Sequence, residues 1–279
     1  MIFPGARTVP TSYLFVDGGN FWELVDEFSK VYHDGSRLGI NWGGVRAAHR
    51  KVYFYDAVPV QQEAEDDNTY GARIAPKLAQ LAEIERSPGF HVRSGDRRYG
   101  GKRRGNEQKM VDVQLAVDAL QMASRGLFDI ATFITGDLDF KPLLDALVDL
   151  GVDVNLQYPP GVTNDKLIVS ADRADPSGPI SIASWIDRSK IELELPEAMH
   201  AFRYNLDDQR AGAELEWTDE KYGLCIIRTI QGGKFKLIAD RSLHSPQSHN
   251  LEIIASRMDT LRAFATSSFG LRVPDTRSS

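Results

Sequence analysis

The stretch Ile130-Ala-Thr-Phe-Ile-Thr-Gly-Asp-Leu-Asp-Phe140 decides the fold of this chain. It opens with an apolar run that is short, β-branched and not alternating, which predicts a strand buried in a parallel sheet. Residues 141–150 follow with apolar side chains at helical spacing. Asp137 and Asp139 therefore lie where a strand passes into a helix, and in open α/β sheets ligands bind at this edge. The alternative is that they only cap the helix and favour its positive end.

The beginning of the chain repeats this arrangement. Residues 13–16 form a compact apolar strand that stops at Asp17, and two glycines then allow a tight turn before a helix over 21–28. Asp17 is thus expected at the carboxyl end of its strand, as Asp137 is. Asn20 either caps the following helix or orients Asp17 by hydrogen bonding.

Strands and helices continue to alternate as far as residue 190. This order predicts a mainly parallel sheet with helices on both faces, and so a three-layer α/β/α domain over residues 12–190. The other elements predicted in it are strands at 51–56, 89–93 and 151–156, helices at 70–86 and 109–122, a short helix at 167–172 and an edge strand at 179–183.

Composition excludes several classes of function. The chain has 279 residues, 26% of them charged and 42% hydrophobic, as in ordinary soluble proteins, and its net charge is −6. No apolar run approaches the roughly 18 residues that a membrane span needs, and we see no export signal, so we expect a cytoplasmic protein without a membrane partner. The single cysteine, Cys225, excludes an internal disulfide and a thiolate metal cluster, and is most simply a small core residue.

The helix predicted over 109–122 carries two further carboxylates. Asp112 falls near its start, where a carboxylate is favoured and can face the strand ends. Asp118 is six residues further on, about 120° around the helix. A ligand role for Asp118 and a role outside the site are equally consistent with this spacing.

Four acids, Asp17, Asp112, Asp137 and Asp139, are thus predicted to meet at one edge of the sheet. Crowded carboxylates repel one another and raise each other's pKa unless a cation intervenes. Oxygen ligands without His or Cys suit Mg²⁺ or Mn²⁺, which activate water and neutralise charge on a phosphate. Because no Ser, His or Cys triad accompanies them, these acids favour metal-assisted phosphodiester hydrolysis.

A basic segment leads from the third predicted strand into the helix that carries Asp112. On an acidic chain such a segment indicates contacts with phosphates, and the alternative is a solvated loop without a partner. We favour a partner and predict that RNA is bound by Arg97, Arg98, Lys102, Arg103, Arg104 and Lys109.

Three motifs, in this order, resemble those of the NYN domain of the PIN-like nuclease superfamily. They are Val16-Asp-Gly-Gly-Asn20, Lys109-x-x-Asp112 with Asp118, and Thr135-Gly-Asp-Leu-Asp-Phe-x-Pro-Leu143. The resemblance covers residues 12–190 and implies a PIN-like α/β/α (Rossmannoid) fold with metal-dependent endoribonuclease activity. It also implies Mg²⁺ or Mn²⁺ binding by the four acids, support of Asp17 by Asn20, an accessory acidic role for Asp118, and a phosphate contact or charge balance by Lys109.

Residues 195–279 fall outside this resemblance and predict a small α+β unit of open role. Strand-like residues 222–230 and 234–239 are joined by Gln231-Gly-Gly233, a hairpin signal. A helix is predicted over 251–264. Its apolar face serves either the core or a homodimer contact, and we favour the core.

The preferred hypothesis is a metal-dependent endoribonuclease that uses water as the nucleophile. The alternative is a non-catalytic RNA-binding module whose acidic pocket is vestigial or holds metal only structurally. A phosphatase is less favoured, because an aspartyl-phosphate enzyme has a second acid two residues after the first, and Gly19 follows Asp17 at that spacing.

Overall fold

The computed structural model describes residues 9–62, 64–94, 107–201, 206–240 and 250–275. The chain forms two compact units, and it crosses between them more than once. The predicted domains 12–190 and 195–279 remain a prediction, since compactness alone does not define where a chain folds independently. Unit 1 comprises Met1–Val25, Ile40–Ser177 and Ser184–Ile186, and unit 2 comprises Asp26–Gly39, Gly178–Ala183 and Asp187–Ser279.

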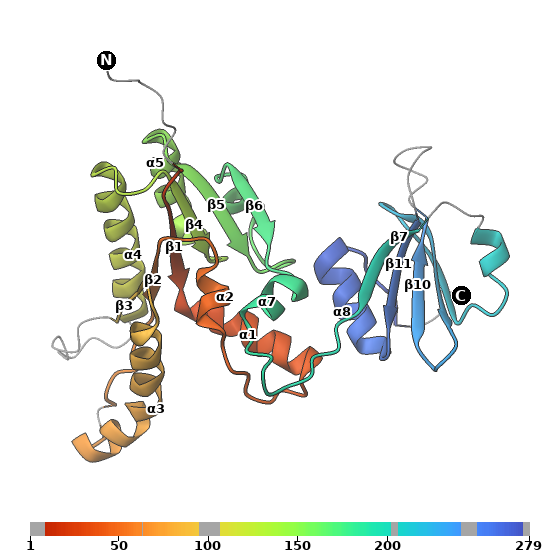
Figure 1. The fold of residues 1–279 in the computed structure, drawn as a ribbon, viewed down its shortest axis with the longest axis horizontal. Coiled ribbons are helices and arrows are strands. Elements are labelled where there is room, and N and C mark those ends of the chain that lie inside the picture. Colours follow the sequence, from red (N-terminus) through yellow and green to blue (C-terminus); the bar gives the residue numbers. More distant parts are fainter. Residues whose placement is uncertain (1–8, 63, 95–106, 202–205, 241–249, 276–279) are drawn as a thin grey trace. The chain divides into compact units, whose positions relative to one another are not determined.

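A six-stranded, wholly parallel sheet is the centre of unit 1 (Figure 1). Its order is β3-β2-β1-β4-β5-β6, so the chain winds outward in opposite directions from β1 and β4. Ligands bind in such sheets at the carboxyl ends of the strands where the order reverses. The strands are β1 (Ser12–Asp17), β2 (Lys51–Tyr55), β3 (Phe90–Arg93), β4 (Ile130–Ile134), β5 (Asp153–Tyr158) and β6 (Arg173–Pro176).

Helices cover both faces of this sheet, which makes the three layers of the predicted PIN-like fold. On one face, α4 (Glu107–Ser124) and α5 (Lys141–Asp149) pack against aromatic residues of the central strands, including Phe15 and Phe133. On the other face, Phe21 of α1 (Gly18–Tyr32) stacks on Trp42 of α2 (Trp42–Arg46). The remaining elements of unit 1 are α3 (Asp67–Arg86), the 3₁₀ helix η2 (Leu138–Phe140) and α6 (Asp165–Ile168), and the residues of α7 (Pro179–Trp185) are divided between the two units.

The predicted strands and long helices of the first 160 residues are confirmed, but two later predictions are wrong. Residues 179–183 belong to the helix α7 and not to an edge strand. The buried residues Pro179, Ile182, Ala183 and Ile186 are three and four apart, which is helical spacing. The helix predicted over 167–172 ends at Ile168, and the strand β6 follows it.

Unit 2 contains a five-stranded antiparallel sheet in the order β7-β11-β10-β9-β8. The helix α8 (Met258–Phe269) packs on one face of it, where Cys225 is also buried. The predicted hairpin is confirmed, and both Gly232 and Gly233 have positive φ there. The strands are β7 (Glu197–Ala201), β8 (Leu215–Asp219), β9 (Gly223–Thr229), β10 (Phe235–Ala239) and β11 (Asn250–Ala255), with a 3₁₀ helix, η3 (Leu206–Gln209), between β7 and β8.

The helix predicted over 251–264 is wrong in its first half. Residues up to Ala255 form β11, in which Leu251, Ile253 and Ala255 alternate toward α8. The helix begins only at Met258. Its residues Leu261 and Phe264 lie in the core, as predicted for the later part of that face.

No helix within the described ranges is both long enough and apolar enough to cross a bilayer.

Replacing Phe133 by Ala tests the packing that holds the central strands. Phe133 is fully buried and stacks on Phe15 with ring centroids 5.1 Å apart. We expect the free energy of unfolding to fall by about 3–5 kcal/mol, because the truncation leaves a cavity in a closed core. Urea unfolding followed by tryptophan fluorescence measures it. Val113→Ala, on the exposed side of α4, is the control and should change stability by no more than about 0.5 kcal/mol. Equal losses in both variants would contradict this account of the core.

Candidate metal centre

Asp17, the last residue of β1, is held by side chains and backbone from two elements. The Thr135 hydroxyl donates to its Oδ2 atom over 2.9 Å. The Asn20 backbone N–H donates to Oδ1 over 3.3 Å, and the Asn20 side-chain amide to Oδ2 over 3.4 Å. Asn20 therefore orients Asp17, the second of the two roles predicted for it. Sequence analysis missed Thr135, which immediately precedes Gly136-Asp137.

The turn after β4 is arranged around the same hydroxyl. Thr135 Oγ1 accepts a hydrogen bond from the backbone N–H of Asp137 over 3.2 Å, so it links the two aspartates. Asp137 Oδ1 then accepts the backbone N–H of Asp139 over 2.9 Å and caps η2. Within the described ranges, Asp137 Oδ2 and both carboxylate oxygens of Asp139 accept no hydrogen bond. Helix capping therefore explains the contact of only one of the four carboxylate oxygens that Asp137 and Asp139 carry.

Asp112 completes the group from α4. Burial raises the pKa of Asp112 to about 6, and the charges of Asp17, Asp137 and Asp139 contribute to the rise in that order. Burial also raises the pKa of Asp17, against the hydrogen bonds from Thr135 and Asn20, and Asp137 adds to the rise. The four predicted ligands are therefore electrostatic neighbours at the crevice between β1 and β4.

The residues present fit a hard divalent cation. All four charged donors are carboxylate oxygens, which Mg²⁺ and Mn²⁺ prefer. Asn20 Oδ1 is buried beside them without a hydrogen-bond partner among the described residues. Buried polar atoms without partners are rare, and a cation or its water would satisfy this one. In the same ranges, however, no group of three or more His, Cys, Asp or Glu side chains is arranged so that it could hold a metal ion.

Asp118 lies apart from this group. Its Oδ2 atom accepts hydrogen bonds from the Tyr55 hydroxyl over 3.0 Å and from Arg93 Nε over 3.3 Å. Its charge is not among those that raise the pKa of Asp112. Of the predicted RNA-binding residues, Lys109 lies in the first turn of α4, and Arg97, Arg98, Lys102, Arg103 and Arg104 lie outside the described residues.

Glycines allow both acidic turns to pack closely. A Cβ atom at Gly18 would lie 2.7 Å from Asp56 and from the Tyr55 carbonyl. A Cβ atom at Gly136 would lie 2.8 Å from Thr163 Oγ1. Each turn therefore packs closely against a neighbouring segment of the chain. This packing fixes the backbone positions of Asp17 and Asp137.

Asp56 is a fifth acid at this edge, but it is committed to an ion pair. It is 7% exposed and accepts hydrogen bonds from Trp22 Nε1 over 3.0 Å and from Lys77 Nζ over 2.5 Å. Because Lys77 neutralises it, Asp56 supports the Gly18 turn and is not needed as a metal ligand.

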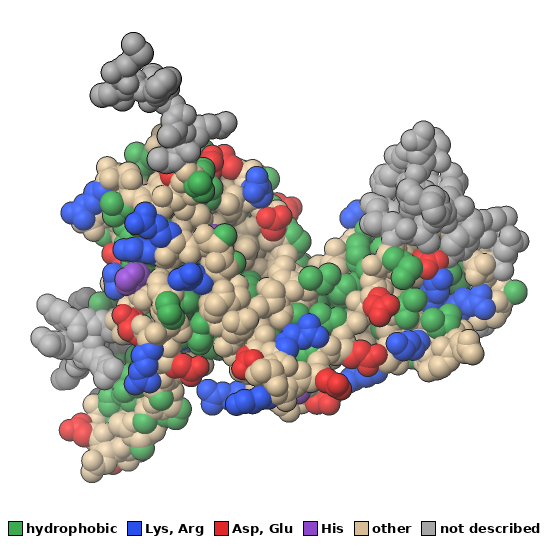
Figure 2. Space-filling view, viewed as in Figure 1, with side chains coloured by type: hydrophobic (Ala, Val, Ile, Leu, Met, Phe, Trp, Pro, Cys, Tyr) green, Lys and Arg blue, Asp and Glu red, His purple; other side chains and the backbone are tan. Residues whose placement is uncertain are grey.

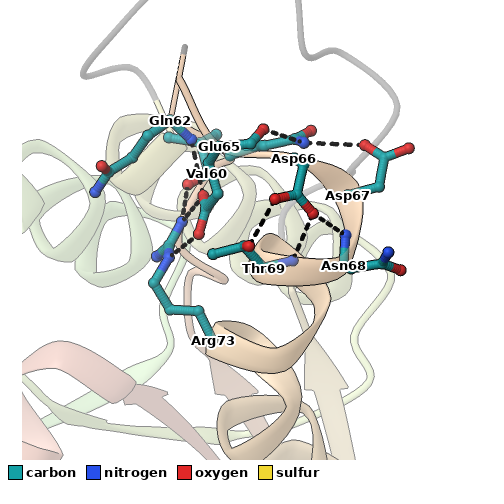
Figure 3. A network of polar contacts seen from close by, with 9 residues as sticks. Val60, Gln62, Glu65, Asp66, Asp67, Asn68, Thr69 and Arg73 are labelled. Atoms are coloured by element: carbon teal, nitrogen blue, oxygen red, sulfur yellow. Dashed lines mark hydrogen bonds and ion pairs between the residues drawn. The ribbon is translucent and has the colours of Figure 1, made fainter.

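The helix that supplies Lys77 is anchored at its start (Figure 3). Asp66 caps α3 by accepting the backbone N–H groups of Asn68 and Thr69. Arg73 donates to both oxygens of Glu65 and holds the pKa of that carboxyl down, at about 2. These contacts fix the connection from β2 to α3, so Lys77 can reach Asp56.

The fold and the acidic edge define a nuclease-like α/β domain. The family model for the NYN domain matches residues 13–177, more than half of the chain. The chain belongs to the NYN domain family, a family of nuclease-like domains, as the resemblance predicted.

Two other comparisons add less. A solved structure of a protein of unknown function from Vibrio parahaemolyticus is similar with a TM-score of 0.47 and 19% sequence identity. The match covers 66% of this chain and 99% of that one. No curated protein matches the chain.

The raised pKa of Asp112 predicts how stability without metal depends on pH. A carboxyl with a higher pKa in the folded than in the unfolded chain binds its proton more tightly when folded. Its favourable contribution is therefore present at low pH and is lost as the pH rises through about 6. We expect Asp112→Asn to be more stable than wild type at pH 8 in EDTA, on the order of 1 kcal/mol after allowance for solvent screening.

Thermal unfolding at pH 4, 6 and 8 measures the difference, which should vanish at the lowest pH. Asp149→Asn, an exposed acid of α5, is the control and should show no such trend. A stability gain from Asp112→Asn that is the same at pH 4 and pH 8 would show that the ionisation of Asp112 is not its cause.

Proposed function

We propose that this protein is a divalent-metal-dependent endoribonuclease that cleaves RNA phosphodiester bonds with water. The observation that carries the proposal is that Asp17, Asp137 and Asp139 lie close enough to Asp112, at the edge where β1 and β4 end, for their charges to add to the rise that burial causes in its pKa. A fold that holds uncompensated acids together in this way favours a cation at the same place.

The chain's own residues divide the work at this site. Asp17, Asp112, Asp137 and Asp139 would hold Mg²⁺ or Mn²⁺, which supplies a water of lowered pKa and neutralises charge on the phosphate. Thr135 and Asn20 orient Asp17 by donating hydrogen bonds to it, and these bonds oppose the rise that burial causes in its pKa. Backbone hydrogen bonds fix Asp137, so its free oxygen points from a rigid turn.

RNA is the substrate that the family and the charges favour. NYN nucleases act on RNA. On the visible face of each unit, Lys and Arg side chains are interspersed with Asp and Glu side chains (Figure 2). The basic sequence that includes Arg97, Arg98, Lys102, Arg103, Arg104 and Lys109 enters α4 directly, and α4 carries Asp112. A polyanion held by such residues would lie along the edge where the acids are.

A non-catalytic RNA-binding module is the second candidate. It is favoured by one observation, that no group of three or more acidic, His or Cys side chains in the described ranges is arranged so that it could hold a metal ion. Such a module would bind RNA in a salt-sensitive way without turning it over in Mg²⁺ or Mn²⁺.

Asp137→Asn is the direct test. We expect it to lower RNA cleavage about 100-fold or more. The metal would stabilise the transition state by several kcal/mol, and an amide binds such a metal more weakly than a carboxylate does. The fold should be unchanged, as judged by circular dichroism. The assay uses RNA and DNA oligonucleotides with Mg²⁺, Mn²⁺ or EDTA, and Asp149→Asn is the matched control on the exposed surface of α5.

Equal cleavage by wild type and Asp137→Asn, after contaminating nucleases are removed, would refute the enzyme assignment. Metal-independent RNA binding without turnover by either protein would favour the second candidate.

A further inference from the structure

Arg93 stands in one row with Asp17 across three strands. Asp17 pairs in register with Tyr55, and Tyr55 pairs in register with Arg93. Neighbouring strands lie about 4.8 Å apart, so the Cα atoms of Asp17 and Arg93 are about 10 Å apart along this edge. Tyr55 packs in the core beneath α4, so in-register Arg93 lies on the same face of the sheet as Asp17.

Asp118 fixes the guanidinium of Arg93 in place. Its Oδ2 atom accepts Arg93 Nε over 3.3 Å and the Tyr55 hydroxyl over 3.0 Å. The guanidinium carbon also lies 5.4 Å from the centre of the Tyr53 ring, within the range of a cation–π contact. A carboxylate from α4, a hydroxyl from β2 and a ring from β2 therefore define where the head group of Arg93 sits.

The guanidinium retains hydrogen-bonding capacity after these contacts. Among the described residues, Asp118 uses Nε, Nη1 makes only a 3.4 Å contact with the Val92 carbonyl, and Nη2 donates to none. The Arg93 side chain is 35% exposed, whereas that of Asp118 is 19% exposed. An ion pair this exposed contributes little to stability, and Arg matches phosphate oxygens in a bidentate fork.

We propose that Arg93 binds a phosphate that flanks the cleaved one in the RNA strand, and that Asp118 is a positioning residue for Arg93 and not a metal ligand. The identity of the polyanion rests on the proposed function. The placement of Arg93 rests on its own contacts. A flanking phosphate is the match because Asp118, which holds the Arg93 head group, lies about 9 Å along α4 from Asp112, farther than a single phosphate spans, and Arg93 is on the same face of the sheet as Asp17.

Two features make Asp118 a poor ligand for the metal, namely its hydrogen bonds and its position on α4. Its Oδ2 atom already accepts two hydrogen bonds. It is six residues beyond Asp112, which is about 9 Å along the helix and about 120° around it. The two acids of α4 therefore serve different parts of one substrate path.

The first arm of the test measures binding by the full chain without catalysis. A labelled single-stranded RNA is titrated in EDTA at several salt concentrations, and fluorescence anisotropy gives the affinity. We expect Arg93→Gln to weaken binding about 10-fold at low salt and to reduce the magnitude of the salt slope by about 0.7, the value for one lost phosphate contact. Arg125→Gln, an exposed arginine after α4, is the control and should change neither.

The second arm separates positioning from metal binding. We expect Asp118→Asn to weaken RNA binding as Arg93→Gln does and to leave the affinity for Mn²⁺, measured by electron paramagnetic resonance, unchanged. Asp137→Asn should lower the Mn²⁺ affinity. The double variant Asp118→Asn with Arg93→Gln should bind RNA no more weakly than Arg93→Gln alone, because the acid acts through the arginine.

Several results would overturn the inference. They are an unchanged salt slope in Arg93→Gln, a loss of Mn²⁺ affinity in Asp118→Asn as large as in Asp137→Asn, additive effects in the double variant, or no salt-dependent RNA binding by wild type. These results do not depend on turnover. A wild-type protein that binds RNA but never cleaves it would therefore refute the proposed enzyme while leaving this test intact.

Discussion

The parallel pairing of β1 with β4 is the constraint on which the rest of this site depends, because it brings the carboxylates at the ends of two strands to one edge. β1 and β4 lie side by side, with Val16 in register with Ile134, so the residues that follow them emerge at the same edge. Asp17 and Asp137 are therefore neighbours whether or not their charges favour it. The aromatic packing beneath, with Phe15 stacked on Phe133, fixes the strands independently of the acids. Burial raises the pKa of Asp112, and the charges of these neighbouring acids add to the rise.

The strands and the acidic residues of this edge could be predicted because short stretches of sequence specify both. An apolar β-branched run shows where a strand ends, and the parallel order brings such ends together. Thr135 could not be recognised in this way, since its hydroxyl acts on Asp17, 118 residues away, through the pairing of β1 with β4. A threonine at a strand end has no distinguishing pattern until the neighbouring strand is known. The same holds for Asp56, whose ion pair with Lys77 depends on how α3 lies against β2.

Two wrong predictions of secondary structure have the same cause, which is that a short run of apolar residues can fit both helical and strand spacing. Leu251, Ile254 and Met258 are spaced as on a helix, yet Leu251, Ile253 and Ala255 also alternate as on a strand, and the pairing of β11 with β7 and β10 decides between them. In α7, by contrast, β-branched residues suggested a strand where Ile182 and Ile186 bury one helical face. Tertiary context overrides local preference in both segments.

The spacing of Asp112 and Asp118 on α4 bears on the kind of substrate that this edge can bind. An α-helix rises by about 1.5 Å per residue, so six residues place the two acids about 9 Å apart along it. Asp112 faces the other three carboxylates, whereas Asp118 faces Tyr55 and Arg93, so one helix positions both an anionic and a cationic patch at a fixed separation. A small phosphoester could touch only one of these patches. A chain of phosphates could touch both at once, so the proposed nucleic-acid substrate agrees with this spacing better than a monoester does.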